Sequence, residues 1–367
     1  MKFESEKSEI VESLQLGASI AERRQTIPIL ANLKIVAINN SVQITATDLE
    51  IQVKINTKVK KVTAEGETTV SARKMSELCR SLPDNEKLEF TLEEGKLTVS
   101  SKNFHADFAT LSSDDFPTLE ISDKGETIEI NSSLLKKLLV KTNFCMASQD
   151  VRYYLNGLLL EIKDSTLTAV ATDGHRLALS SSKLSNSTNN NVRLIIPRKA
   201  VLELSKSLNQ SDEEVQVILA QSSIEVKNSS MQFTSKLVDG KFPDYGKVFP
   251  KGESNKLTVS IENLQGALTR AAVLSNEKYR GVRFQLAKNL LKLTANNPEK
   301  ESAEEVIEVD YKGAELEIGF NIGYILDVLN SMESEEVELH FFSEESSCLI
   351  NEPGNESEVY VIMPMRL

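Results

Sequence analysis

The chain has 367 residues, 40% of them hydrophobic, and a formal net charge of −12. This length allows two or three ordinary domains, and no apolar run approaches the ~18 residues of a membrane-spanning helix. Residues 1–6 lack the apolar centre of a signal peptide. Three scattered cysteines (Cys79, Cys145 and Cys348) fit a reducing compartment better than a disulfide framework. We therefore expect a cytoplasmic protein with no membrane association.

The predicted elements recur in the same order three times along the chain. Helical periodicity appears at residues 8–24, 134–147 and 262–275, and a strand group follows at 32–35, 154–158 and 281–284. A second helix is predicted at 72–80, 197–204 and 322–329, and Pro197 suits a first helical turn because its missing N–H is not needed there. Closing strands reach residues 115–119, 241–245 and 359–364. Each third of the chain therefore reads as helix, strands, helix, strands.

One strand and turn marks the period of this repeat. The stretch from Val170 to Leu177 (VATDGHRL) predicts a strand that ends in a turn at Asp173–Gly174. Incomplete copies stand at residues 42–50 and 291–299, so that Thr47, Thr172 and Asn296 are 125 and 124 residues apart. We predict one α+β domain used three times, as residues 1–124, 125–252 and 253–367. Residues 181–191, rich in Ser, Asn and Thr, are expected to form an exposed loop.

The positive charge is concentrated in the predicted helices. The six helical windows (8–24, 72–82, 134–147, 197–208, 262–275 and 322–332) together carry +5, although the whole chain carries −12. A single basic helix would reflect only the preference of helix surfaces for Lys and Arg. The contrast over repeated units instead indicates a basic surface, suited to phosphates, within an acidic protein.

Signals for catalysis, nucleotide binding and metal binding are weak. The chain lacks a GxxxxGK[ST] loop, a GxGxxG fingerprint and a GxSxG elbow. None of His105, His175 and His340 has a second metal-type ligand at helical spacing, so no metal or cofactor is expected. Asp173 and His175 are two residues apart, and a hydrolase using this pair is one alternative. A scaffold that binds peptides but not DNA is another.

Five segments closely resemble one family, the bacterial sliding clamp, or β subunit of DNA polymerase III. They are residues 149–157 (QDVRYYLNG), 171–177 (ATDGHRL), 233–245 (FTSKLVDGKFPDY), 274–283 (LSNEKYRGVR) and 360–367 (YVIMPMRL). The resemblance implies three domains of the DNA-clamp fold, each with two helices backed by antiparallel sheets. It also implies a head-to-tail homodimer that closes into a ring, with the helices lining the hole.

The same resemblance implies the function and the partners. The protein would be a processivity factor in DNA replication that encircles duplex DNA without reading its sequence, and it would have no catalytic residues. A shared surface would bind short peptides of the replicative polymerase, the clamp loader, other polymerases, and repair and ligation proteins.

Three sets of site residues carry over from the family. The DNA-binding set comprises Arg24, Arg73, Gln149, Tyr153, Tyr154, Arg198 and Lys199. The partner-peptide set comprises Leu155, Thr172, Gly174, His175, Arg176, Leu177, Pro243, Val248, Asn321, Tyr324, Val361, Met363, Pro364, Met365 and Arg366. The dimer-interface set comprises Lys74, Phe108, Val273, Leu274, Glu299, Glu301 and Glu305.

The residue types of the partner-peptide set suit its implied role. Leucine, proline and methionine side chains make an adaptable apolar groove, and Arg176 and Arg366 are expected to orient a peptide through its carbonyls or acids. At the dimer interface the chain departs from the family pattern, because Asn103 and His105 stand where the family has arginines. We therefore expect a ring that dissociates measurably on dilution.

Overall fold

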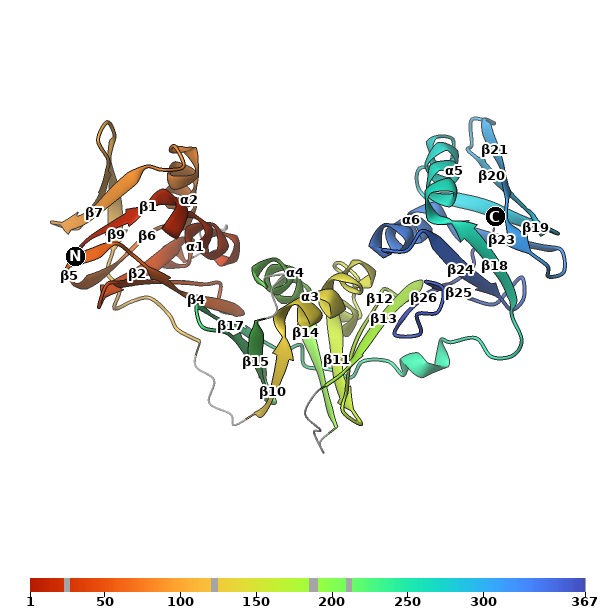
Figure 1. The fold of residues 1–367 in the computed structure, drawn as a ribbon, viewed down its shortest axis with the longest axis horizontal. Coiled ribbons are helices and arrows are strands. Elements are labelled where there is room, and N and C mark those ends of the chain that lie inside the picture. Colours follow the sequence, from red (N-terminus) through yellow and green to blue (C-terminus); the bar gives the residue numbers. More distant parts are fainter. Residues whose placement is uncertain (23–26, 120–124, 185–190, 209–212, 367) are drawn as a thin grey trace. The chain divides into compact units, whose positions relative to one another are not determined.

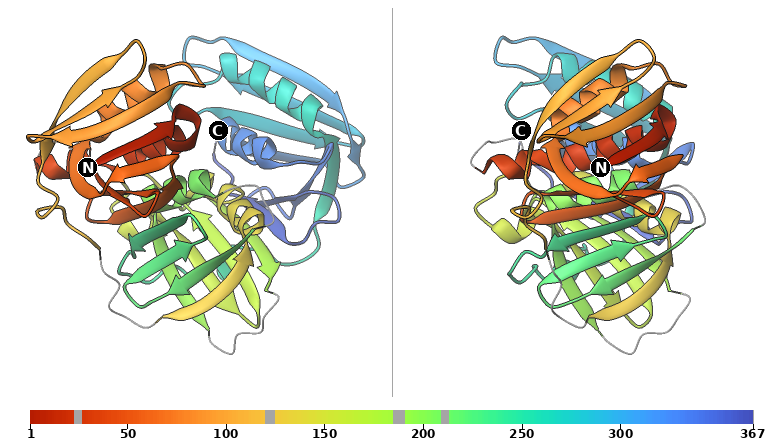
Figure 2. Two further views of the ribbon diagram at one scale, coloured as in Figure 1. Left: turned by 60° about the vertical axis from the view of Figure 1, so that its left-hand side comes forward. Right: turned by 90° about the vertical axis from the view of Figure 1, so that its left-hand side faces the viewer.

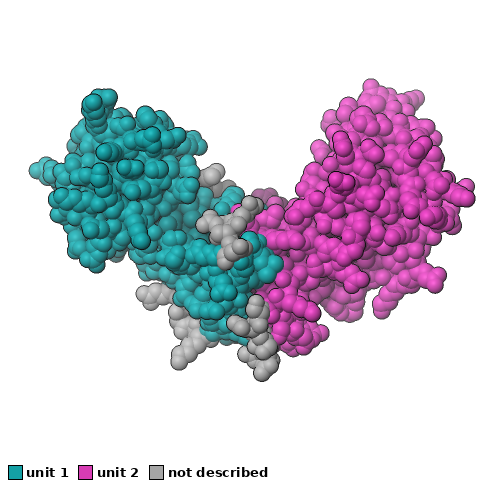
Figure 3. All heavy atoms as spheres, in the orientation of Figure 1, with its two compact units in different colours: residues 1–135, 202–237 teal, residues 136–201, 238–367 magenta. Residues whose placement is uncertain are grey.

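A computed structural model describes residues 1–22, 27–119, 125–184, 191–208 and 213–366. The chain divides into two compact units (Figure 3). The first unit contains residues 1–135 and 202–237, and the second contains residues 136–201 and 238–367. Arg24, of the predicted DNA-binding set, lies outside the described residues.

The three repeats share one order of elements, with a strand before each helix (Figure 1). The first contains β1 (Lys2–Glu6), α1 (Lys7–Ile20), β2 (Asn32–Ile38), β3 (Ser41–Thr47), β4 (Ile51–Lys58), β6 (Gly66–Ser71), α2 (Ala72–Ser81), β7 (Lys87–Glu93), β8 (Lys96–Ser100) and β9 (His105–Leu111). A short 3-10 helix, η1 (Pro28–Ala31), precedes β2, and β5 (Lys61–Ala64) lies along β1.

The second repeat contains β10 (Glu126–Asn131), α3 (Ser132–Val140), β11 (Gly157–Lys163), β12 (Thr166–Thr172), β13 (Arg176–Lys183), β14 (Val192–Pro197), α4 (Arg198–Ser207), β15 (Glu214–Leu219), β16 (Ser223–Lys227) and β17 (Met231–Lys236). Three short 3-10 helices accompany it: η2 (Asn143–Cys145), η3 (Tyr153–Leu155) and η4 (Tyr245–Lys247).

The third repeat contains β18 (Asn255–Ser260), α5 (Ile261–Val273), β19 (Gly281–Ala287), β20 (Leu290–Asn296), β21 (Ser302–Glu308), β23 (Leu316–Asn321), α6 (Ile322–Ser331), β24 (Glu336–Phe341), β25 (Cys348–Asn351) and β26 (Glu358–Ile362). The two-residue β22 (Asp310–Tyr311) pairs with β18.

Antiparallel strand pairing joins successive repeats. The sheet of the first unit runs β10-β15-β16-β17-β4-β3-β2-β6-β9-β8-β7-β1-β5, so β17 of the second repeat pairs with β4 of the first. In the second unit, a sheet runs β14-β11-β12-β13-β26-β25-β24-β18-β22, and β26 of the third repeat pairs with β13 of the second. The same strand positions therefore make both joints, while β21, β20, β19 and β23 form a separate sheet.

The helices are amphipathic and pack in pairs. In α2, Ala72, Met75 and Cys79 are buried at helical spacing, while Arg73 and Lys74 are exposed between them. Figures 1 and 2 show α1 beside α2 and α5 beside α6. Burial therefore places basic side chains of α2 on the face away from its core.

A buried ion cluster stabilises the joint between the second and third repeats. The Lys141 ammonium, just after α3, donates to the Ser331 carbonyl (2.5 Å) and lies 3.5 Å from Glu358 at the start of β26. The Lys141 and Glu358 side chains are only 5% and 3% exposed. Glu358 also pairs with Lys137 (2.7 Å), so it is the removal of Glu358 that would leave the Lys141 ammonium without its buried partner, which is destabilising.

Several sequence predictions need correction. Residues 134–147 are not one helix, because α3 ends at Val140 and residues 143–145 form η2. Pro197 ends β14 rather than starting α4, and residues 153–155 are a 3-10 helix, not a strand. Residues 115–119 and 241–245 carry no strand, because their backbones have no ladder partner.

The loop predicted at 181–191 begins later, because β13 extends to Lys183, and residues 185–190 lie outside the described part of the chain. No helix among the described residues is long and apolar enough to cross a membrane.

Candidate functional site

The turn between β12 and β13 is held by its own side chains. Thr172 Oγ1 donates to the Arg176 carbonyl (2.6 Å) and accepts from the Gly174 N–H (3.1 Å). Asp173 Oδ1 accepts from the N–H groups of His175 (2.9 Å) and Arg176 (3.0 Å). Gly174 has φ +91°, and a Cβ there would lie 3.0 Å from the Arg152 guanidinium, so the turn requires glycine.

Arg176 is the centre of a largely buried polar cluster. Its guanidinium donates to Asp173 Oδ2 (3.0 Å), Asp327 Oδ2 (2.6 Å) and the Phe144 carbonyl (2.7 Å). It also lies 4.5 Å from the centroid of the Tyr324 ring. Burial opposes the charge of Arg176, but the carboxylates of Asp327 and Asp173 raise its pKa and keep it protonated. Three of its five N–H donors therefore have internal partners, which fix the orientation of the guanidinium.

Three other residues of the predicted peptide set belong to the core. Leu177 and Val361 form a cluster with Leu159, Val170, Ile195 and Phe242, and each of these side chains is almost fully buried. Leu155 is also buried, at 2% exposure. These three side chains therefore pack in the core beneath the exposed members of the set.

The C-terminal segment is attached to this turn through the backbone. The Met363 N–H donates to the His175 carbonyl (2.9 Å), and the Met365 N–H donates to the Gly319 carbonyl (2.9 Å). Met363 is 38% exposed, Arg366 and His175 are exposed, and Pro364 and Met365 are half-buried. The turn and the chain end therefore share one surface.

The remaining members of the set lie on two further segments. Asn321 accepts from the Tyr324 N–H (3.3 Å) and caps α6, so both residues are placed by the same helix start. Pro243 is exposed, and Val248 packs against the Leu177–Val361 cluster. Tyr245 between them donates to Glu161 (2.5 Å), and burial together with this hydrogen bond raises the pKa of Tyr245 to about 12.

The predicted DNA-binding residues have different environments. In the first unit, Arg73 is exposed and donates to Glu77 (2.8 Å). In the second unit, Arg198 is half-buried and donates to the Met146 carbonyl (2.9 Å), whereas Lys199 is exposed. Tyr153 is 57% exposed and meets half-buried Tyr154 edge to face, with ring centroids 5.8 Å apart.

The loop that carries Gln149 is held by hydrogen bonds of its own side chains. Asp150 binds Arg152 through both carboxylate oxygens (3.0 and 2.8 Å), and Arg152 also donates to the Asp173 carbonyl (3.1 Å). Exposed Gln149 has φ +58°. Val151, at 95% exposure, is an apolar tip that the sequence reasoning missed, because no periodic pattern distinguishes it.

The predicted interface residues lie on separate edges. In the first unit, Lys74 is exposed on α2 and Phe108 is half-buried on β9. In the second unit, Val273 is 78% exposed at the end of α5, Leu274 follows it, and Glu299 and Glu301 are exposed before β21. Glu305 on β21 accepts from Arg270 (2.7 and 2.9 Å), which lowers the pKa of Glu305. Val306 on β21, 56% exposed, was not predicted.

The geometry of Asp173 and His175 does not suit hydrolysis. Both carboxylate oxygens of Asp173 already accept hydrogen bonds from the turn and from Arg176. Asp173 is therefore a structural residue of the turn rather than a partner that orients the His175 ring. Among the described residues, no group of three His, Cys, Asp or Glu side chains could hold a metal ion.

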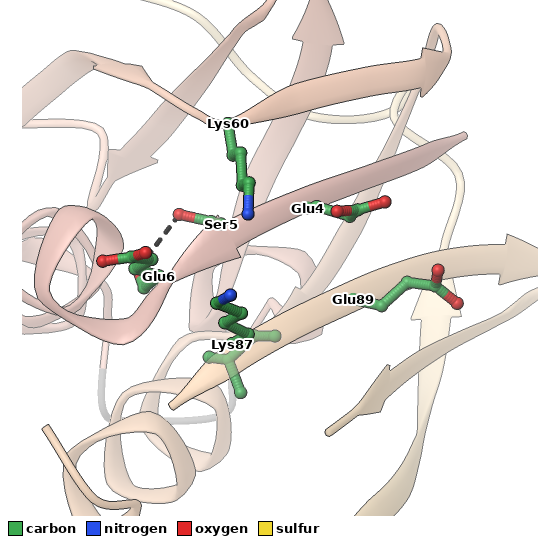
Figure 4. Close-up of a pocket in the computed structure, with 7 residues that line it drawn as sticks. Glu4, Ser5, Glu6, Lys60, Lys87 and Glu89 are labelled. Atoms are coloured by element: carbon green, nitrogen blue, oxygen red, sulfur yellow. Dashed lines mark hydrogen bonds between the residues drawn. The ribbon is translucent and has the colours of Figure 1, made fainter. Parts of the chain in front are cut away.

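A cavity of about 310 Å³ in the first unit contains none of the predicted site residues (Figure 4). Glu4, Ser5, Glu6, Lys60, Lys87, Leu88 and Glu89 line it. Figure 4 shows the Lys60 side chain, from the bend between β4 and β5, and the Lys87 side chain, from the start of β7, reaching toward β1. Three carboxylates against two ammonium groups do not favour an anion, so we assign it no ligand.

The fold repeats three times, and equivalent strands form the joint between each pair of successive repeats. This arrangement defines a three-domain clamp protein. The DNA polymerase III beta subunit family matches in three parts: its N-terminal domain at residues 1–120, its central domain at 129–244 and its C-terminal domain at 246–366. The chain belongs to this family, the β sliding clamps.

The sequence is similar to those of individual relatives over the whole length of each chain. The chain is 45% identical to the beta sliding clamp of Pseudomonas putida and 41% identical to that of Escherichia coli, covering 100% of each chain. A solved DNA polymerase III β subunit of Pseudomonas aeruginosa has a TM-score of 0.94 at 43% identity, and a Pseudomonas aeruginosa clamp bound to griselimycin has 0.96 at 44%; coverage is again complete for both chains.

Proposed function

We propose that this protein is a DNA sliding clamp: a non-enzymatic processivity factor that encircles duplex DNA as a homodimeric ring and tethers the replicative polymerase. The observation that carries the proposal is the use of one type of strand pairing at every repeat boundary. The proposal is also supported by the match of the whole chain to the β sliding clamp family.

Two strand edges are left for a second copy. The last strand of the second repeat pairs with β4, and the last strand of the third pairs with β13. The last strand of the first repeat, β9, pairs with β6 only at Thr110 and Leu111, which leaves residues 105–109 open on that edge. Among the described strands, β21, the strand of the third repeat equivalent to β4 and β13, has no partner on its outer edge. Pairing β9 of one copy with β21 of another satisfies both edges, and two such joints close a ring.

The two joints within the chain also predict the register of the joint between copies. Phe233 pairs with Val53, and Tyr360 pairs with Ala178. Superposing the ladders of the three repeats makes Ala106 equivalent to Phe233 and Tyr360, and Ala303 equivalent to Val53 and Ala178. Ala106 is therefore expected opposite Ala303 of the second copy, with His105 opposite Glu304 and Phe108 opposite Glu301.

The proposed DNA contacts are electrostatic. Helices α2, α3 and α4 each carry a net positive charge, supplied in part by Arg73, Arg198 and Lys199, although the chain as a whole is acidic. Contacts from Arg and Lys to phosphates carry no sequence information, which suits a sliding protein. Arg24 is also proposed to meet phosphates, and Gln149, Tyr153 and Tyr154 a strand at the face of the ring.

The proposed partner site is the surface formed by the β12–β13 turn, the start of α6, residues 243–248 and the C-terminal segment, which we call the terminal surface. A short peptide that buries one Leu- or Phe-sized side chain gains roughly 1.5–3 kcal/mol, and ordering the peptide offsets part of this. Modest affinity allows the polymerase, the clamp loader, other polymerases, and repair and ligation proteins to exchange there.

The proposed domain limits are residues 1–124, 125–252 and 253–367. The proposed location is the cytoplasm, because the three cysteines are free and buried, as expected in a reducing compartment.

The proposal is tested by loading labelled protein onto nicked circular DNA with a clamp loader and then cutting half of the sample with a restriction enzyme. A ring stays on the uncut circles in high salt and leaves the cut molecules by sliding off their ends. A scaffold that does not encircle DNA would be lost equally from both.

A further inference from the structure

We infer that Asp327 is a positioning residue for peptide binding, acting through Arg176 rather than by touching the peptide. The inference deepens the proposed function of the terminal surface and rests on it. Asp327 is outside the residue set that the family resemblance implies, and its role follows from its contacts.

Asp327 connects α6 to the turn after β12. Its Oδ2 atom accepts from the Arg176 guanidinium at 2.6 Å, and the other side of the same guanidinium is held by Asp173 at 3.0 Å. The Arg176 side chain is 11% exposed, whereas Asp327 is 47% exposed at the rim of the cluster. Arg176 therefore links the β12–β13 turn to α6. Among the described residues, Asp327 is its only carboxylate partner on α6.

The orientation of the Arg176 guanidinium determines the positions of Tyr324 and His175. It lies over the Tyr324 ring at 4.5 Å, and its bond to Asp173 supports the carboxylate that holds the His175 N–H. Without Asp327, the Arg176 donor nearest α6 loses its acceptor, and only Asp173 and the Phe144 carbonyl hold the guanidinium against the Tyr324 ring. A bound peptide would then have to order these groups itself, which lowers affinity.

The test measures binding of griselimycin, the ligand of the related Pseudomonas aeruginosa clamp, by calorimetry on full-length protein. We expect Asp327→Ala to weaken binding about tenfold, because the cost of ordering Arg176 and Tyr324 is moved to the binding step. Asp310→Ala is the matched control, because Asp310, on β22 in the same unit, forms an exposed ion pair with Lys312, and it should leave binding unchanged.

A double-mutant cycle separates positioning from general destabilisation. If Asp327 acts through Arg176, the double variant Asp327→Ala/Arg176→Ala binds no more weakly than Arg176→Ala alone. The isosteric Asp327→Asn variant, which keeps one acceptor, should recover part of the affinity and provides a folded variant if the alanine does not fold.

Each remaining outcome counts against a defined claim. Unchanged binding by both Asp327 variants, or additive losses in the cycle, would overturn the role of Asp327 while leaving the terminal surface intact. Failure of the unmodified protein to bind griselimycin would overturn the terminal surface itself, and the role of Asp327 with it.

Discussion

Arg152, Arg176 and Arg198 each have acceptors within the protein. Arg176 holds two carboxylates and a carbonyl, Arg152 joins Asp150 to the Asp173 carbonyl, and Arg198 donates to the Met146 carbonyl. Their charge is thus presented from fixed positions, which reduces the entropy lost on binding. The expectation that Arg176 orients a peptide stays a prediction, and the internal hydrogen bonds of its guanidinium fix the position from which it would do so.

The Asp150–Arg152 pair provides a pH-dependent test of the loop that carries Gln149. The hydrogen bonds from the Arg152 side chain and N–H lower the pKa of Asp150 to about 2. Because the folded pKa lies below the usual value of 3.8, the pair stabilises the loop above that pH and the contribution is lost as pH falls through about 2. Carboxyl resonances in NMR titrations should show the low pKa, and Arg152→Ala should return it toward 3.8.

Lys247→Ala serves as the control for this titration, because Lys247 pairs with Asp244 and not with Asp150. It should leave the Asp150 transition in place. An Asp150 carboxyl that already titrates near 4 in the unmodified protein would show that the pair does not form in solution.

Among the elements, the periodic helices were the easiest to predict. Residues 72–80 and 322–329 correspond to α2 and α6 within two residues, because buried apolar side chains recur at helical spacing. The strands before the first helix of each repeat were missed, since β1, β10 and β18 are only five or six residues long. The 125- and 124-residue period matches the ladders, where Thr47, Thr172 and Asn296 end β3, β12 and β20.

The convergence of site residues could not be predicted from spacing. Arg176 and Asp327 are 151 residues apart and meet only because β26 pairs with β13, next to α6. The family resemblance supplied Arg176 and Tyr324, but it could not indicate which neighbour holds the guanidinium. Likewise, the resemblance placed Leu155, Leu177 and Val361 in the partner-peptide set, but only the packing shows that their side chains are buried.

The predicted joint between copies can be tested at the level of its two strands. In the variant Ala106→Cys/Ala303→Cys, directly opposed Cα atoms would lie about 4.5–5.5 Å apart, within disulfide range. Mild oxidation should therefore give covalent dimers on a non-reducing gel. The native cysteines are buried and should not interfere; burial raises the pKa of Cys79 to about 12.

The control pairs Ala106→Cys with Glu304→Cys, because a shift of one residue directs the side chain to the opposite face of the sheet. This pair should cross-link poorly. Equal cross-linking of both pairs, or none of either, would reject the transferred register.

At the scale of the whole molecule, a ring has two identical joints, so a small change in the affinity of one joint counts twice in the stability of the ring. His105 replaces a family arginine, lies 3.3 Å from Asp107 and is expected opposite Glu304 of the second copy. His105→Arg adds a permanent positive charge there, worth about threefold in affinity per joint and so about tenfold for the ring. Sedimentation across a dilution series should show this tightening.

His340→Arg is the matched substitution away from the joint, since His340 contacts Ser254 and Glu338 within the third repeat. It should leave dimerisation unchanged. A His105→Arg protein that dissociates as readily as the unmodified protein would place Glu304 away from position 105.

The central claim is that the protein holds DNA by enclosing it, and closing both joints covalently on DNA tests this most directly. The Ala106→Cys/Ala303→Cys protein is loaded onto nicked circular DNA, oxidised, and treated with sodium dodecyl sulfate after free thiols are blocked. We predict that the cross-linked dimer remains on intact circles in detergent and is released when a restriction enzyme linearises them. Loss of cross-linked dimer from intact circles as rapidly as from linear DNA would contradict encirclement.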